Sequence, residues 1–138
     1  MSWQAYALLS AIAAGVTAVL AKLGVEGVPS NLATAIRTIV ILALAWAIVL
    51  ARGEHHALGG ISRRSLVFLV LSGLATGLSW LAYYRALQLG PASRVAPIDK
   101  LSLPLAIILA ALVLNEPISW RLAVGVALMT VGALLTIT

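Results

Sequence analysis

Five long apolar runs, separated by short turns and one polar loop, constrain the fold of this chain more than any other feature. Each run holds about 20 residues, the length at which a helix rising 1.5 Å per residue crosses the hydrocarbon core of a bilayer. The chain is 62% hydrophobic and 9% charged, whereas about a quarter of the residues in a soluble domain are charged. We therefore expect an all-α, polytopic membrane protein.

The five predicted helices form one transmembrane domain over residues 1–138, in which short turns join antiparallel neighbours. Gly24 and the proline Pro91 mark helix ends, because glycine closes helices and the residue before a proline leaves the helical region. Ser30 or Asn31 is expected to cap the second helix, and Ser119 the last. The predicted spans are residues 3–23, 31–51, 66–88, 92–114 and 119–137.

The basic residues lie scattered at span ends or within spans, which is typical of topology signals and not of a phosphate-binding patch. No nucleic-acid partner is therefore expected, and the lipid bilayer is the surrounding medium. Loop 52–65 and Arg121 hold four basic residues on the predicted cytoplasmic side, against three to five on the other side. A bias this weak is what a chain that inserts in both orientations would show.

Five polar or aromatic side chains are predicted to lie at one depth in the bilayer. Arg37 lies about 9 Å into the second span from its outer end, and Asp99 and Lys100 lie about 10–12 Å into the fourth. Trp80 and Tyr84 lie about 6–12 Å from the same end of the third span. Because a charge in hydrocarbon costs a few kcal/mol, we expect Asp99 to meet a cation, Arg37 or a Lys100. These residues are candidate substrate or proton contacts.

Each of these residues also has a purely structural interpretation. Arg37 and Asp99 would then form an ion pair that holds two helices together. Trp80 and Tyr84 would be anchors at the lipid interface.

Two prolines, Pro97 and Pro104, bracket the charged pair of the fourth span, and proline disrupts the interior of a helix. Pro104 has no N–H for the carbonyl of Lys100, so that oxygen should lack its helical partner and be available to a ligand. We therefore expect irregular geometry between Pro97 and Pro104. Broken helices at the level of the substrate recur in secondary transporters.

The third span carries a polar stripe that either lines a cavity or forms hydrogen bonds between helices. Its members are spaced by three or four residues and are Ser72, Thr76, Ser79 and Tyr83. Small residues that permit close helix packing are Gly73 and Gly77 in the third span and Gly125 and Gly132 in the last.

Two stretches, SWLAYYRALQLGPASRVAPIDKLS and LVLNEPISWRLAVGVALMTVGALL, resemble the EamA branch of the drug/metabolite transporter superfamily. The resemblance is greatest to its small five-helix bacterial and archaeal group, which has one EamA unit. Most members of the wider family have two such units, related as inverted repeats around a central cavity. The resemblance implies movement of metabolites with no bound cofactor. Since this chain has one unit, it also implies a second copy inserted upside down, an antiparallel homodimer.

The sequence thus predicts a multi-pass protein of the plasma or inner membrane that acts as a secondary transporter subunit. Its substrate would be a small polar or zwitterionic metabolite, moved by alternating access. The alternative is a structural or regulatory subunit of a larger transporter. An enzyme is not expected, since one intramembrane acid with both histidines in a loop gives no catalytic pairing. Glu54, His55 and His56 lack further ligands nearby, so no metal site is predicted.

Overall fold

The computed structural model describes residues 2–136, and within that range every element of regular structure is helical. The predicted all-α class is confirmed. The elements are α1 (Trp3–Gly24), α2 (Ser30–Ala51), the 3₁₀ helix η1 (Glu54–Gly60), α3 (Arg63–Leu89), α4 (Ala92–Asp99), α5 (Ser102–Leu114) and α6 (Trp120–Leu135).

Four helical segments are long and apolar enough to cross a membrane: α1, α2, α3 and the stretch Ala92–Leu114 that contains α4 and α5. The last helix, α6, has 16 residues and covers about 24 Å at 1.5 Å per residue. The end of the fifth predicted span, residue 137, lies outside the described residues. Helices thus occupy the predicted spans, with the fourth divided in two.

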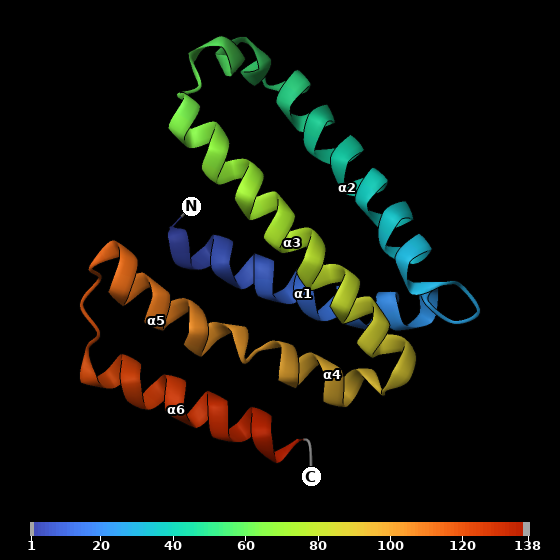
Figure 1. Cartoon of the computed structure of the whole chain (residues 1–138), viewed down its shortest axis with the longest axis vertical. Helices are drawn as coiled ribbons and strands as arrows, with labels where there is room; N and C mark the ends of the chain where they lie inside the picture. The colour runs from blue at the N-terminus through green and yellow to red at the C-terminus, as the bar shows by residue number, and fades with distance from the viewer. Residues whose placement is uncertain (1, 137–138) are drawn as a thin grey trace. The chain divides into compact units, whose positions relative to one another are not determined.

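The described residues divide into two compact units, and each is considered by itself. The α2–α3 unit, Leu20–Leu89, contains α2 and α3 as antiparallel neighbours connected through η1 (Figure 1). The α4–α6 unit combines the chain up to Val19 with the chain from Gly90 onward, and in it α6 contacts both α4 and α5.

Local backbone chemistry explains where the helices end. After α1 ends at Gly24, the turn needs a positive φ of 73° at Gly27, which glycine adopts without steric cost. Asn115 ends α5 with a φ of 56°, since asparagine tolerates the left-handed region better than other side chains do. The predicted cap of the last helix is confirmed, because the Ser119 hydroxyl accepts a hydrogen bond of 3.2 Å from the Leu122 N–H.

The predicted cap of α2 was wrong. The cap position is held by Pro29, and no side chain caps the helix. Proline already fixes φ for the turn, and Ser30 then becomes the first helical residue. In the polar loop, η1 occupies Glu54–Gly60, and α3 begins at Arg63.

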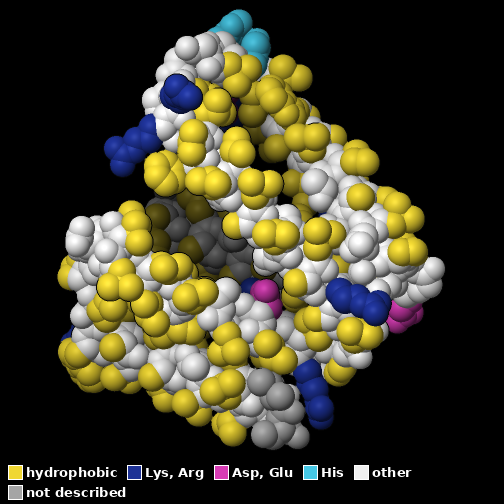
Figure 2. Space-filling view, viewed as in Figure 1, with side chains coloured by type: hydrophobic (Ala, Val, Ile, Leu, Met, Phe, Trp, Pro, Cys, Tyr) yellow, Lys and Arg dark blue, Asp and Glu magenta, His cyan; other side chains and the backbone are white. Residues whose placement is uncertain are grey.

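Apolar side chains cover the outside of the helices instead of filling a core. Leu78 and Leu112 are 71% and 73% exposed, and the fully buried large side chains are Val25 and Leu87. Figure 2 shows hydrophobic side chains over the visible helix surfaces, with the histidines of η1 at one end of the α2–α3 unit. Helices that are apolar all round belong in hydrocarbon, so these surfaces fit a bilayer.

Candidate functional site

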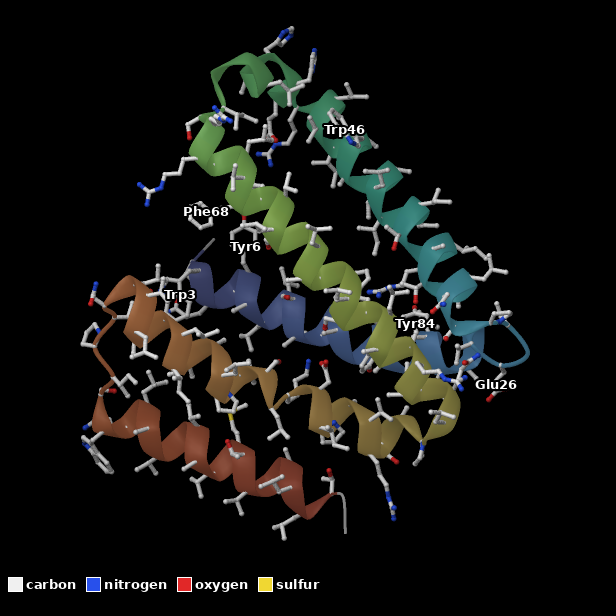
Figure 3. All side chains as sticks on the ribbon, in the orientation of Figure 1. Trp3, Tyr6, Glu26, Trp46, Phe68 and Tyr84 are labelled. Atoms are coloured by element: carbon white, nitrogen blue, oxygen red, sulfur yellow. The ribbon has the colours of Figure 1, made fainter. Side chains whose placement is uncertain are left out.

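A stacked cluster of one cation and two aromatic rings joins α2 to α3. The Cζ atom of Arg37 lies 3.4 Å from the centroid of the Trp80 ring and 5.6 Å from that of Tyr84. Tyr84 is 5% exposed, and in Figure 3 it lies on the side of α3 that faces the first half of α2. These three residues therefore lie together at one level of the α2–α3 pair, and their common depth in the bilayer stays a prediction.

The antiparallel geometry of the two helices places the cluster. Arg37 is the eighth residue of α2, and Tyr84 lies five residues before the end of α3. Each is then roughly 7–11 Å from the same end of the pair, at 1.5 Å per residue. A guanidinium resting on an indole face is attracted by the ring quadrupole, which compensates part of the cost of a charge in an apolar setting.

The edge of the Arg37 guanidinium is available to a ligand. Within the α2–α3 unit, the contacts of this side chain are the two ring contacts, and it forms no ion pair or hydrogen bond there. The nearby hydroxyls are committed to their own helix: Thr34 donates to the Ser30 carbonyl at 2.9 Å, and Thr38 donates to the Thr34 carbonyl at 2.8 Å. A planar group with free N–H donors can bind a carboxylate through two parallel hydrogen bonds.

Contacts between the ends of α1 and α3 support this cluster, and sequence reasoning did not find them. The Lys22 ammonium donates a 2.7 Å hydrogen bond to the carbonyl of Leu87, near the C-terminus of α3. The Gln88 amide donates a 2.6 Å bond to the Val28 carbonyl. A cation at a helix C-terminus satisfies carbonyls that have no partner within the helix, and a basic residue just before Gly24 was the available signal.

In the α4–α6 unit, the helix breaks at the charged pair, as predicted. Helix α4 ends at Asp99 and α5 begins at Ser102. The Lys100 carbonyl lacks its helical partner because Pro104 has no N–H. It is not free, however, since it accepts a 3.0 Å bond from the Leu103 N–H.

The two charges at this break face each other. The Lys100 ammonium lies 3.3 Å from a carboxylate oxygen of Asp99, and their side chains are 52% and 36% exposed. With α5 beginning at Ser102, Pro104 lies in its first turn, where backbone N–H groups have no acceptor in the helix. Because α5 begins only two residues before Pro104, the proline disrupts no interior hydrogen bond of that helix. The Asp99 carboxylate and the Lys100 ammonium lie side by side at the break.

Three of the four residues of the predicted polar stripe lie on open surfaces, and Tyr83 is half-buried. Ser72, Thr76 and Ser79 are exposed on α3, and the Thr76 hydroxyl donates to the Ser72 carbonyl at 2.9 Å. Tyr83, the fourth member of the stripe, lies edge-on to Tyr84 with ring centroids 6.5 Å apart. That this stripe lines a cavity stays a prediction.

The glycines predicted to pack helices are equally open. A methyl group built on Gly73, Gly77, Gly125 or Gly132 would meet nothing within 4 Å. Their role in helix contact stays a prediction. The structure thus brings together Arg37, Trp80 and Tyr84 in one unit and Asp99, Lys100 and Pro104 in the other, and the pairing of Asp99 with Arg37 stays a prediction.

The acidic loop residue has a local partner. A carboxylate oxygen of Glu54 lies 3.4 Å from Arg52, and the rings of His55 and His56 stack at 4.0 Å. Across the described residues, no three His, Cys, Asp or Glu side chains are grouped so as to hold a metal ion.

Comparisons with known proteins agree along the whole chain. The EamA-like transporter family matches residues 1–138. A Sinorhizobium sp. protein, described as an uncharacterized transporter in the cobO 3' region, is 53% identical over 134 residues, which cover 97% of this chain and 95% of that protein. No solved structure matches the chain.

Proposed function

The chain belongs to the EamA-like transporter family, and from this premise we propose that it is a secondary transporter subunit for a small polar or zwitterionic metabolite. The membrane character follows from the family and from the four long apolar helical segments. The proposal adds the substrate class, alternating access and a multi-pass arrangement in the cell membrane.

The observation that carries the proposal is the state of Arg37. Its guanidinium rests on Trp80 at 3.4 Å while its edge has no partner among the described residues. An intramembrane arginine is costly unless it faces a partner or water. A guanidinium with available N–H donors, next to two aromatic rings, suits a metabolite that carries a carboxylate.

The broken helix supplies the second half of the proposed mechanism. Asp99 would take up the coupling proton or bind the ammonium group of a zwitterion. Lys100 would then be released from its 3.3 Å contact with Asp99. Interrupted helices that present charges near the bilayer midplane recur in transporters built from inverted repeats. Protonation or substrate binding at Asp99 would thus change the local ion pair that holds the break.

The working unit in this proposal is an antiparallel homodimer. One copy offers α1, α2, α3, the α4–α5 segment and the shorter α6, which are few helices to surround a cavity and seal both ends. A second copy related by a two-fold axis in the membrane plane would supply the missing inverted repeat. The open faces at Gly73 and Gly77 leave room for such a neighbour.

Flux measurements test the transport role. Purified protein in liposomes is screened for uptake of labelled neutral amino acids, with and without an imposed pH gradient. We expect Asp99→Asn and Arg37→Gln to lose most of the flux at unchanged protein abundance, because each removes a charge needed in the cycle. The matched control is Arg63→Gln at the start of α3, which should keep its flux.

Two results would contradict this assignment. Wild-type flux in Asp99→Asn removes the coupling role of the carboxylate. If Asp99→Asn and Arg37→Gln lower the amount of folded protein and not the flux per molecule, the two residues stabilise the structure. A structural or regulatory subunit then becomes the better interpretation.

Cysteine labelling tests the orientation. The chain has no native cysteine, and Leu58 in η1 is 54% exposed, so Leu58→Cys gives a single accessible thiol. We expect an impermeant maleimide to label about half of the protein in intact cells and the rest after permeabilisation, since each dimer would show one η1 on each side. Labelling confined to one side would exclude the antiparallel homodimer.

A further inference from the structure

An apolar groove runs between α5 and α6, and Pro104 is the one residue that it shares with the candidate transport site. Its volume is about 300 Å³, and its walls include Ile107 and Pro104 of α5 and Leu122, Gly125 and Met129 of α6. The one charged side chain that lines it is Arg121. A volume of this size lies at the lower limit of ligand-binding cavities in proteins.

The position of Arg121 indicates the chemistry of the occupant. It is the second residue of α6, so it lies at the end of the span, at the level of lipid headgroups. Its neighbour Trp120 is 73% exposed, and exposed tryptophan is typical of the membrane interface. The groove therefore has a cation at its interfacial end and apolar walls that extend inward to Met129, eight residues and about 12 Å further.

Arg121 has no structural role that explains its presence. Within the described part of the chain it forms no ion pair or hydrogen bond, and Glu116 in the preceding turn does not pair with it. A cation in the first turn of a helix is also unfavourable, because the N-terminus carries the positive end of the helix dipole. The dipole and the guanidinium both favour an anion at this point.

We propose that the α5–α6 groove binds an anionic phospholipid, with its phosphate on Arg121 and one acyl chain along the apolar walls. The lining of the groove is apolar apart from Arg121, and acyl chains are present along any helix surface that faces hydrocarbon. Basic pockets between transmembrane helices recognise anionic headgroups, and Arg121 in the first turn of α6 supplies the basic group here. The proposal does not depend on which metabolite is moved.

A second copy of the chain is the competing occupant, since Gly125 and Gly132 share this side of α6. The unpaired cation favours the lipid, because a phosphate supplies the missing charge in either orientation of the chain.

Lipid retention tests the assignment. The full chain is incorporated into nanodiscs with equal amounts of phosphatidylglycerol and phosphatidylcholine, and the lipids that stay bound are counted by native mass spectrometry. We expect wild-type protein to retain phosphatidylglycerol preferentially. Arg121→Gln should reduce the preference about fivefold, the effect of one basic residue at an anionic surface. Gly125→Leu should remove the bound lipid, because its side chain would extend into the groove from a position where an added Cβ atom meets nothing within 4 Å.

Matched controls are Arg63→Gln, which removes one basic residue from the same predicted side, and Gly15→Leu, which makes the same change at an open glycine of α1. Both should retain lipid as the wild type does. Equal retention of the two lipids, or a preference unchanged in Arg121→Gln, would overturn the proposal. A loss of dimer in Gly125→Leu with lipid retention unchanged would assign the groove to a second copy instead.

Discussion

The contact between Arg37 and Trp80 should stabilise the α2–α3 unit by an amount that a double-mutant cycle can isolate. A cation over a ring contributes about 0.5–1 kcal/mol when exposed and about 2 kcal/mol or more when desolvated. Both side chains are half-buried, and at 3.4 Å the guanidinium is in direct contact with the ring. We therefore expect a coupling free energy of about 1–2 kcal/mol.

A cycle is needed because the single variants have opposing effects. Arg37→Gln removes the cation–π contact but also removes the cost of an intramembrane charge, a few kcal/mol. Trp80→Leu leaves Arg37 with only the Tyr84 ring, at 5.6 Å. Combining Arg37→Gln, Trp80→Leu and the double variant cancels the single-site terms and leaves the pairwise term. The free energy of unfolding is measured by helical circular dichroism in mixed micelles as denaturing detergent is increased.

The chain supplies a matched weak pair. Arg64 lies 5.9 Å from the ring centroid of Phe68, which projects from the side of α3 opposite α2 (Figure 3). Its cycle should give less than about 0.5 kcal/mol, because the ring is exposed. Equal coupling in the two cycles, or less than about 0.3 kcal/mol for Arg37 and Trp80, would refute the interpretation of the cluster as a stabilised cation.

Three further changes test the local architecture. Pro104→Ala supplies the N–H that the Lys100 carbonyl lacks, so amide exchange should slow across the break while substrate flux falls; unchanged exchange would show that the break does not depend on this proline. Lys22→Met removes the 2.7 Å bond to the Leu87 carbonyl and should lower the free energy of unfolding by about 1.5–3 kcal/mol. An unchanged unfolding curve would mean that this hydrogen bond does not stabilise the folded protein. Ser119→Ala removes the cap of α6 and should cost about 1 kcal/mol, whereas Ser119→Thr should keep most of it.

The helix boundaries could be predicted because they depend on short-range backbone chemistry. The first helix ends at Gly24 as predicted, and the break at Pro104 follows from an absent donor. The predicted cap of α2 at Ser30 was wrong, because the neighbouring Pro29 occupies the cap position. Local rules identify a turn correctly but do not decide between two adjacent residues that both suit it.

The cluster at Arg37 was half predictable. Counting residues from the ends of two antiparallel helices gave its depth, but not which faces met, because an apolar helix in a bilayer has no hydrophobic side that selects its neighbour. The contacts of Lys22 with Leu87 and of Gln88 with Val28 were not predictable for a further reason. They join segments 60 or more residues apart, and although the basic residue in the last turn of α1 signals a polar contact, it does not indicate which carbonyl accepts the bond.

The scarcity of buried side chains bears on the proposed assembly more strongly than the distribution of charges does. In a bilayer, lipid chains are as apolar as leucine, so helices associate through close packing of small residues and through polar contacts. Here the polar contacts join the ends of α1 and α3, while Gly73 and Gly77 remain open along the middle of α3. Glycine costs about 1 kcal/mol relative to alanine inside a helix, and close approach of a neighbouring backbone is what usually offsets that cost. An open glycine face in the middle of a span is thus a reason to expect a neighbouring helix there, which the proposed second copy would supply.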